Sequence, residues 1–359
     1  MTKFLCCLLA SICSMAIHAQ VFQVSGKVVD KQTGQALSGA SVVCQSTTIG
    51  TTTNAEGLFT LSLPQGGYDL AITYSGYETQ SFRINGQTEN IRNLSVEMKQ
   101  KEKSMEEVSI TVSNEVKDGW DKYGAFFRDQ FLGQTANSAR CRIENPEALK
   151  FYFNKKKNRL KVTAKEDIRI QNQALGYTIR YQLDSFVHEY ASGATLFTGF
   201  PFFEEMKGTP ETETEWASNR EKAYYGSMLH FMRCYYDSTL GENGYKIERL
   251  DPNTEKPRLL RNPYDSAVFS RDEYREAEIR LPGKIRVVYS QEKPEPLYLT
   301  LNKLSAQTTV QVSIAEFPDL VTIEENGYYY DQREILALGY WGWEKIGEIL
   351  PYNYEPAGD

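Results

Sequence analysis

Two histidines beyond residue 20, His188 and His230, are the first candidates for chemistry, because histidine is a common zinc ligand and general base. A zinc hydrolase needs three fixed protein ligands and an open position, often with an H-x-x-E arrangement. His188 is followed directly by Glu189 and has no glutamate at the third position, and His230 is followed by Phe-Met-Arg. Neither spacing suits zinc, so we predict no metal site and no cofactor.

The side chains around His230 could form a nucleophile pair, since Ser227 lies three residues before it and Cys234 four residues after it. Serine hydrolases often carry the nucleophile in a G-x-S-x-G turn, which the sequence lacks. A reactive cysteine usually sits at a helix start, where the dipole lowers its pKa, but Cys234 comes late in its predicted helix. The sequence also has no P-loop and no G-x-G-x-x-G motif. We therefore predict structural roles for these side chains and assign no catalytic residue.

Carboxylates leave one enzymatic alternative open. Acidic residues cluster ahead of a predicted helix, at Glu204, Glu205, Glu211, Glu213 and Glu215. A glycosidase needs two opposed carboxyl groups at a set separation, which sequence spacing does not reveal. A solvated acidic loop is the simpler interpretation. An envelope hydrolase with a carboxylate-based site in the C-terminal region remains the alternative to a binding function.

Aromatic residues are the main binding candidates, and the chain has 23 tyrosines, 17 phenylalanines and 4 tryptophans. They concentrate in GYYYDQ and GYWGWEK, and the candidates are Tyr328, Tyr330, Tyr340, Trp341 and Trp343. Exposed rings of this kind stack on sugars or anchor a protein interface. The simpler interpretation is that they cover the core of the C-terminal region.

Three cysteines remain beyond the leader, Cys44, Cys141 and Cys234. An odd number cannot be fully paired within one chain, so the pattern is not a disulfide scaffold. Buried thiols are the favoured interpretation. A bridge between Cys141 and Cys234 is the one pairing that we keep open for an oxidising compartment.

Residues 1–19 have the features of a signal peptide. Lys3 supplies a positive charge, the stretch from Phe4 to Ile17 is apolar, and Ala19 is a small residue suited to cleavage. We expect secretion across the inner membrane, to the periplasm or the outer membrane, and no transmembrane span after cleavage. The formal net charge is −7 and no basic stripe dominates, so we predict no nucleic-acid partner.

Residues 20–98 alternate between apolar and polar side chains over several short runs, such as Phe59, Leu61 and Leu63. This period of two is typical of half-buried strands, and glycine-rich turns separate the runs. The order of features, SGKVVDKQTGQALSGASV followed by NAEGLF and GGYDL, resembles the carboxypeptidase regulatory-like domain. The resemblance implies a transthyretin-like β-sandwich. It does not imply carboxypeptidase activity, because the zinc ligands are missing.

Residues 99–113 are predicted to be a linker, because their first half, KQKEKSME, is charged. The segment MEEVSITVS resembles the one that follows this domain in TonB-dependent receptors of Bacteroidetes. The remaining length is too short for such a receptor. An accessory role in a TonB-dependent uptake system is therefore a second alternative.

Residues 114–359 mix strand patterns with helical spacing, which predicts an α+β region of unassigned activity. The clearest helix is expected at 214–240, where apolar residues recur on one face. Segments including ALGYTIRYQLDSF and GYWGWEKIGEILPYNYEP resemble a group of Bacteroidetes envelope proteins that join the same sandwich to such a region. The predicted fold is thus β-rich and mixed, with one long helix. The leading hypothesis is a secreted, non-enzymatic binding or structural module with a protein or glycan partner.

Overall fold

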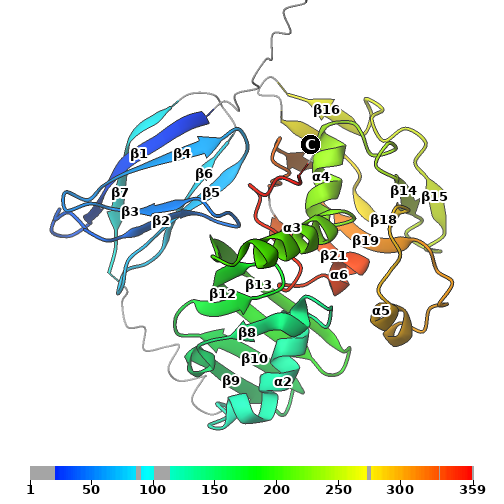
Figure 1. The fold of residues 1–359 in the computed structure, drawn as a ribbon, viewed down its shortest axis with the longest axis horizontal. Coiled ribbons are helices and arrows are strands. Elements are labelled where there is room, and N and C mark those ends of the chain that lie inside the picture. The colour runs from blue at the N-terminus through cyan, green and yellow to red at the C-terminus, as the bar shows by residue number, and fades with distance from the viewer. Residues whose placement is uncertain (1–20, 86–89, 101–113, 273–275, 331, 358–359) are drawn as a thin grey trace, which may run out of the picture.

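The computed structural model describes residues 21–85, 90–100, 114–272, 276–330 and 332–357. They form three β-rich units arranged around the C-terminal segment (Figure 1). We call residues 21–98 the sandwich, residues 114–205 the middle unit, residues 228–343 the C-terminal unit, and residues 344–357 the tail. The predicted signal peptide and most of the predicted linker lie outside the described residues.

The sandwich confirms the β-structure expected from the alternating pattern. One sheet has the order β4-β1-β7 and the other β3-β2-β5-β6, with β7 running parallel to β1. Side chains of alternate residues, among them Val24, Phe59 and Leu61, are buried between the two sheets. The strands are β1 Val21–Asp30, β2 Ser41–Cys44, β3 Gly50–Thr52, β4 Leu58–Pro64, β5 Tyr68–Thr73, β6 Gln80–Ile84 and β7 Ile91–Met98.

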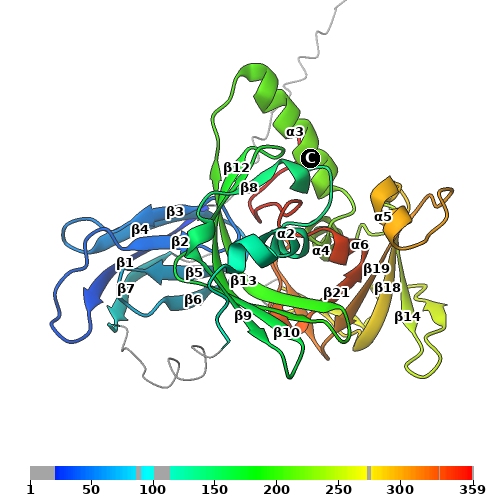
Figure 2. The same cartoon turned by 90° about the horizontal axis from the view of Figure 1, so that it is seen from below.

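The middle unit is a six-stranded antiparallel sheet covered by one helix, α2 (Gly119–Phe131) (Figure 2). Phe127 and Phe131 of this helix are fully buried, and Phe127 packs against Phe186 of the sheet with ring centres 4.9 Å apart. The long β12–β13 hairpin forms one side of the sheet. The strands are β8 Cys141–Ile143, β9 Leu149–Asn154, β10 Arg159–Ala164, β11 Ile168–Asn172, β12 Tyr177–Glu189 and β13 Ala194–Glu205.

The C-terminal unit holds a five-stranded sheet, β15-β14-β18-β19-β21, and a three-stranded sheet, β16-β17-β20. Phe231 of helix α4 (Met228–Tyr236) packs on this core, with its ring centre 5.1 Å from that of Trp341. The described part of the predicted α+β region thus contains two large hydrophobic cores and a small third cluster around Tyr298 and Tyr340. Its elements are β14 Tyr245–Leu250, β15 Pro257–Leu259, β16 Phe269–Arg271, β17 Ala277–Ile279, β18 Gly283–Tyr289, α5 Pro296–Leu301, β19 Gln311–Phe317, β20 Val321–Ile323, β21 Leu336–Gly339 and α6 Tyr340–Trp343.

The single helix predicted for 214–240 is wrong, because the chain forms two helices there, α3 (Pro210–Tyr224) and α4 (Met228–Tyr236). Gly226 interrupts them with a φ of +86°, a backbone conformation that side chains disfavour. Ser227 then caps α4 by accepting a hydrogen bond from the His230 N–H. The break turns the chain from the middle unit to the C-terminal unit.

Replacing Gly226 with alanine is expected to lower the free energy of unfolding by about 1–3 kcal/mol. Besides the positive φ, a Cβ atom here would lie 2.6 Å from Gln311 Oε1 and 3.0 Å from the Tyr289 ring. Gly241→Ala is the matched control, because a Cβ there meets no described atom within 4 Å. We expect this control to change stability by less than about 0.5 kcal/mol in urea denaturation. Equal effects of the two substitutions would contradict the explanation of the helix break.

Candidate functional site

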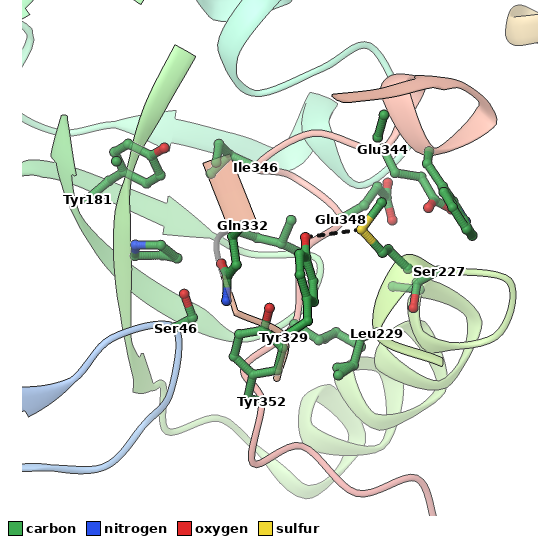
Figure 3. A pocket seen from close by; sticks show the side chains of 18 residues that line it. Ser46, Tyr181, Ser227, Leu229, Tyr329, Gln332, Glu344, Ile346, Glu348 and Tyr352 are labelled. Atoms are coloured by element: carbon green, nitrogen blue, oxygen red, sulfur yellow. Dashed lines mark hydrogen bonds between the residues drawn. The ribbon is translucent and has the colours of Figure 1, made fainter. Parts of the chain in front are cut away.

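A cavity of about 310 Å³ lies where the three units meet the tail. Figure 3 shows Ser46 and Tyr181 on one side of it in that view, and Ser227 and Glu344 on the other. Ser46 comes from the loop between β2 and β3 of the sandwich, and Tyr181 comes from β12 of the middle unit. Helix α4 adds Leu229, and the tail adds Glu348. Cavities of this volume hold small organic ligands.

The tail reaches the cavity because it is hydrogen-bonded to the middle unit. The backbone N–H groups of Ile346 and Gly347 donate to the carbonyls of Phe131 and Leu132, at 3.3 and 2.9 Å. The Asn172 side chain donates to the Gly347 carbonyl at 3.0 Å. The Ile346 side chain is buried in the middle core. These contacts fix Glu344 and Glu348 on either side of an anchored segment.

The sandwich is joined to the middle unit and to the tail through its β2–β3 loop. The Ser46 N–H donates to the Pro201 carbonyl of β13 at 2.6 Å, and the Ser46 carbonyl accepts from the Tyr352 N–H of the tail at 2.8 Å. The Thr48 N–H donates to Asn353 Oδ1 at 2.9 Å. The loop is therefore held between β13 and the tail, and the sandwich forms part of the cavity wall.

A second contact joins the sandwich to the C-terminal unit at Gly67. Asn326 donates to the Gly67 carbonyl at 3.0 Å and accepts from its N–H at 3.3 Å. The Tyr328 hydroxyl donates to Asp69 Oδ2 at 2.9 Å. A Cβ atom on Gly67 would lie 2.5 Å from Cγ of Glu324, so glycine permits this close approach. The glycine turn predicted from the sequence thus also serves as a docking point.

Arg233 of α4 links the docking contacts to the tail. It is only 7% exposed, and its Nε donates to the Asn326 carbonyl at 3.1 Å. Its Nη2 donates to the Tyr352 carbonyl at 2.9 Å. A single buried guanidinium therefore satisfies two backbone carbonyls in segments that both hold the sandwich.

Two carboxyl groups, those of Glu344 and Glu348, face the cavity. Glu348 is 9% exposed, and its Oε2 accepts a hydrogen bond from Asn137 at 2.8 Å. Its Oε1 is buried and has no hydrogen-bond partner among the described residues. Burial raises the pKa of Glu348 to about 7, and the nearby Thr135 and Asn137 groups offset only part of this rise. Burial also raises the pKa of Glu344 well above its ordinary value, and the neighbouring Glu348 raises it further.

The aromatic candidates do not form one exposed binding surface. Tyr328, Tyr340 and Trp341 are buried, and the partly buried Trp343 packs on Tyr298 beside Tyr340. Trp341 is the member of this set that lines the cavity, where its Nε1 donates to the Gly226 carbonyl at 2.8 Å. The core interpretation therefore explains most of these rings.

Tyr328 and Tyr330 contact the sandwich. The Arg83 guanidinium of β6 lies over the Tyr330 ring at 4.6 Å. The Tyr330 hydroxyl, which has one hydrogen to donate, lies 2.8 Å from Glu324 Oε1 and 3.0 Å from Glu276 Oε1. These tyrosines do recognise a protein surface, but it belongs to their own chain.

The candidates for nucleophilic chemistry have structural roles. Ser227 Oγ donates a hydrogen bond to the Tyr224 carbonyl at 2.6 Å and accepts one from the His230 N–H, which caps α4. Its hydroxyl is therefore used both as a donor and as an acceptor. His230 is buried, its Nδ1 accepts from the Gly226 N–H at 3.2 Å, and burial lowers its pKa to about 4. His188 pairs with Thr195 at 2.8 Å in the middle unit. The acidic cluster is mainly exposed, with Glu205 paired to Arg220.

No disulfide joins Cys141 and Cys234 in the described residues. Cys141 is buried in the middle core and Cys234 in the core of the C-terminal unit. The two sulfur atoms thus belong to different cores. Burial raises the pKa of the Cys141 thiol to about 12, which keeps it protonated and unreactive.

Glu344 and Glu348 were not among the residues predicted from the sequence, although both lie in the segment that includes GYWGWEK and its continuation. Their four-residue spacing matches no ligand or catalytic motif. The signal was the combination of a tryptophan-rich turn with acidic residues near the end of the chain. Within the described residues, no group of His, Cys, Asp and Glu is arranged to hold a metal ion.

Residues 24–110 match the CarboxypepD_reg-like domain family, which confirms the domain predicted at the N-terminus. TonB-dependent receptor P3 of Formosa agariphila is 29% identical over 94 residues, which are 26% of this chain and 9% of the receptor. The chain thus spans about a tenth of the length of this curated relative. None of the described helices is long and apolar enough to cross a bilayer.

Two solved structures show limited similarity. A DUF3823 family protein from Bacteroides ovatus is 11% identical, with 52% of this chain and 82% of that chain covered and a TM-score of 0.19. A streptococcal ancillary pilin is 20% identical, with 23% and 30% covered and a TM-score of 0.19.

Proposed function

We propose that the protein is a non-enzymatic binding module of the bacterial cell envelope, with the junction cavity as its ligand site. The observation that carries this proposal is Glu348 Oε1, a buried acceptor without a described partner in a ligand-sized cavity. Burying such an atom without a hydrogen bond costs about 1–3 kcal/mol, and a bound donor would recover this cost. Native folds leave few buried acceptors unsatisfied, so this atom needs an explanation, and a bound ligand would supply one.

The envelope part of the proposal rests on the sequence relatives. The N-terminal domain is shared with a TonB-dependent receptor, and residues 1–19 have the pattern of a secretory signal. We place the mature protein in the periplasm or at the outer membrane. An accessory role beside a TonB-dependent receptor is consistent with the same match, and co-purification of such a receptor after gentle extraction would support it.

The sandwich has a defined part in this function. Its β2–β3 loop contributes Ser46 to the cavity wall and is hydrogen-bonded to β13 and to the tail. A ligand in the cavity would therefore contact all three units, and binding would strengthen their association. In this view the accessory domain completes the site and does not only tether the protein.

Native mass spectrometry of the protein after incubation with an envelope extract tests the proposal. We expect a retained small molecule, and we expect Ala337→Phe to reduce the retained fraction at least tenfold because residue 337 lines the cavity. Leu338→Phe is the matched control, since this neighbour on β21 is 47% exposed. Retention that is equal in both variants, or no retained molecule in the wild type, would contradict the cavity as the ligand site.

A carboxylate-dependent hydrolase is the second candidate, because Glu344 and Glu348 share a cavity and both have raised pKa values. Neighbouring groups with different pKa values can divide the roles of acid and base. This candidate predicts turnover of a glycoside or ester panel that is lost in Glu348→Gln and in Glu344→Gln. The binding proposal predicts that no substrate turns over faster with the wild type than with these variants.

A further inference from the structure

The acidic and basic side chains that line the cavity are all acidic, and a cation bound beside them would favour their ionised form. Glu344 and Glu348 are its ionisable carboxyl groups, and no lysine, arginine or histidine is among the described residues that line it. Lys345 follows Glu344 in the sequence but does not line the cavity. An anionic ligand would therefore meet two carboxyl groups and no compensating cation. A cation would gain from the same arrangement.

The cavity wall is also rich in aromatic side chains. Tyr181, Tyr329, Trp341 and Tyr352 line it together with aliphatic residues. Aromatic rings attract cations through their negative faces, and they also accept the apolar body of an organic ligand. Sites that combine several rings with a carboxyl group are suited to ammonium groups.

The unsatisfied hydrogen-bond acceptor in the cavity also favours a ligand that carries N–H donors. Glu348 Oε1 is buried without a hydrogen-bond partner among the described residues, and the Glu344 carboxyl group lines the same cavity. A purely apolar ligand would leave Glu348 Oε1 unsatisfied. An ammonium group carries three N–H donors and could satisfy both carboxyl groups at once.

We propose that the cavity binds a small organic cation, a primary ammonium group attached to a short apolar body. This inference rests on the proposed function, and it adds the ligand's charge and shape. The ammonium group lies between Glu344 and Glu348, and the apolar body extends along the rings toward Tyr181. The volume of about 310 Å³ limits the ligand to a small molecule.

Isothermal titration calorimetry with three probes of similar shape tests the charge. The probes are phenethylamine, the uncharged 2-phenylethanol and the anionic 3-phenylpropionate, each added to the mature chain at pH 7.5. We expect phenethylamine to bind at least tenfold more tightly than either other probe. We expect Glu348→Gln to weaken phenethylamine at least tenfold and Glu344→Gln to weaken it several-fold.

Glu316→Gln is the matched control, because Glu316 is exposed on β19 and does not line the cavity, and it should leave binding unchanged. Circular dichroism confirms folding, and Glu344→Gln carries the test if Glu348→Gln does not fold. Preferential binding of 2-phenylethanol or 3-phenylpropionate, blocked by Ala337→Phe, would overturn the cation inference and keep the cavity as a ligand site. No binding of phenethylamine, or binding that both glutamine variants leave unchanged, would also overturn the inference. The envelope-extract experiment would still decide the proposed function separately.

Discussion

Replacing Arg233 with methionine is expected to lower the free energy of unfolding by about 3–5 kcal/mol. Methionine keeps much of the side-chain volume but leaves the Asn326 and Tyr352 carbonyls without the N–H donors that they have at 3.1 and 2.9 Å. Asn326 holds Gly67 of the sandwich, and the Tyr352 N–H holds Ser46. The substitution should therefore loosen both docking contacts, and we expect proteolysis to remove the tail faster than in the wild type.

Arg169→Met provides the control for losing an arginine. Its ion pair with Glu166 spans 3.7 Å, and the two side chains are 46% and 57% exposed. Solvent screens such a pair, so we expect a loss below about 1 kcal/mol in chemical denaturation. If Arg233→Met behaved like this control and the tail stayed resistant to protease, Arg233 would not be the link between the docking contacts.

The stability of the wild type relative to Glu348→Gln is expected to fall by about 3 kcal/mol as the pH rises from 4.5 to 7. Burial raises the pKa of Glu348 from its ordinary value of 4.5 to about 7 in the folded chain. Between these values the folded state binds more protons than the unfolded state, so stability is lost as the pH increases. The stability gained from keeping Glu348 protonated is fully present below pH 4.5 and is lost above pH 7. Glutamine has the same shape and does not titrate in this range.

Urea denaturation at half-unit steps from pH 4.5 to 8 measures this difference. The variant Glu316→Gln controls for the loss of one carboxyl group at an exposed site. The free energy of unfolding of each glutamine variant is subtracted from that of the wild type at each pH. The comparison of the two differences separates the titration of Glu348 from that of the other groups. If the stability difference between the wild type and Glu348→Gln stayed constant across this pH range, burial would not raise the pKa of Glu348.

The contacts between the sandwich and the C-terminal unit explain the aromatic segment GYYYDQ. Rings concentrated as in GYYYDQ are typical of recognition surfaces, and here Tyr328 and Tyr330 do recognise Asp69 and Arg83 of the sandwich. These contacts are made with β5 and β6, whereas the β2–β3 loop at the cavity is hydrogen-bonded to Pro201 and Tyr352. We therefore expect these two tyrosines to hold the sandwich and not to form an exposed glycan-binding face.

The prediction of a single helix failed at Gly226, where packing against distant strands breaks the helix. The apolar spacing continues across Tyr225, Gly226 and Ser227, so periodicity alone extends one helix through them. Gly226 instead adopts a positive φ where Tyr289 and the Gln311 side chain leave no room for a Cβ atom. Packing against β18 and β19 decided the break, and neither strand is near this segment in the sequence.

The sequence alone determined the sandwich and the β-rich, mixed character of the chain. Alternation and glycine turns are local signals, and residues such as Phe59, Leu61 and Leu63 are buried as their spacing predicts. The tertiary structure alone decided the cavity, because Ser46, Tyr181 and Glu348 come from segments far apart in the chain. A raised carboxyl pKa or an unpaired acceptor depends on what surrounds the group after folding, and no spacing along the chain records those surroundings.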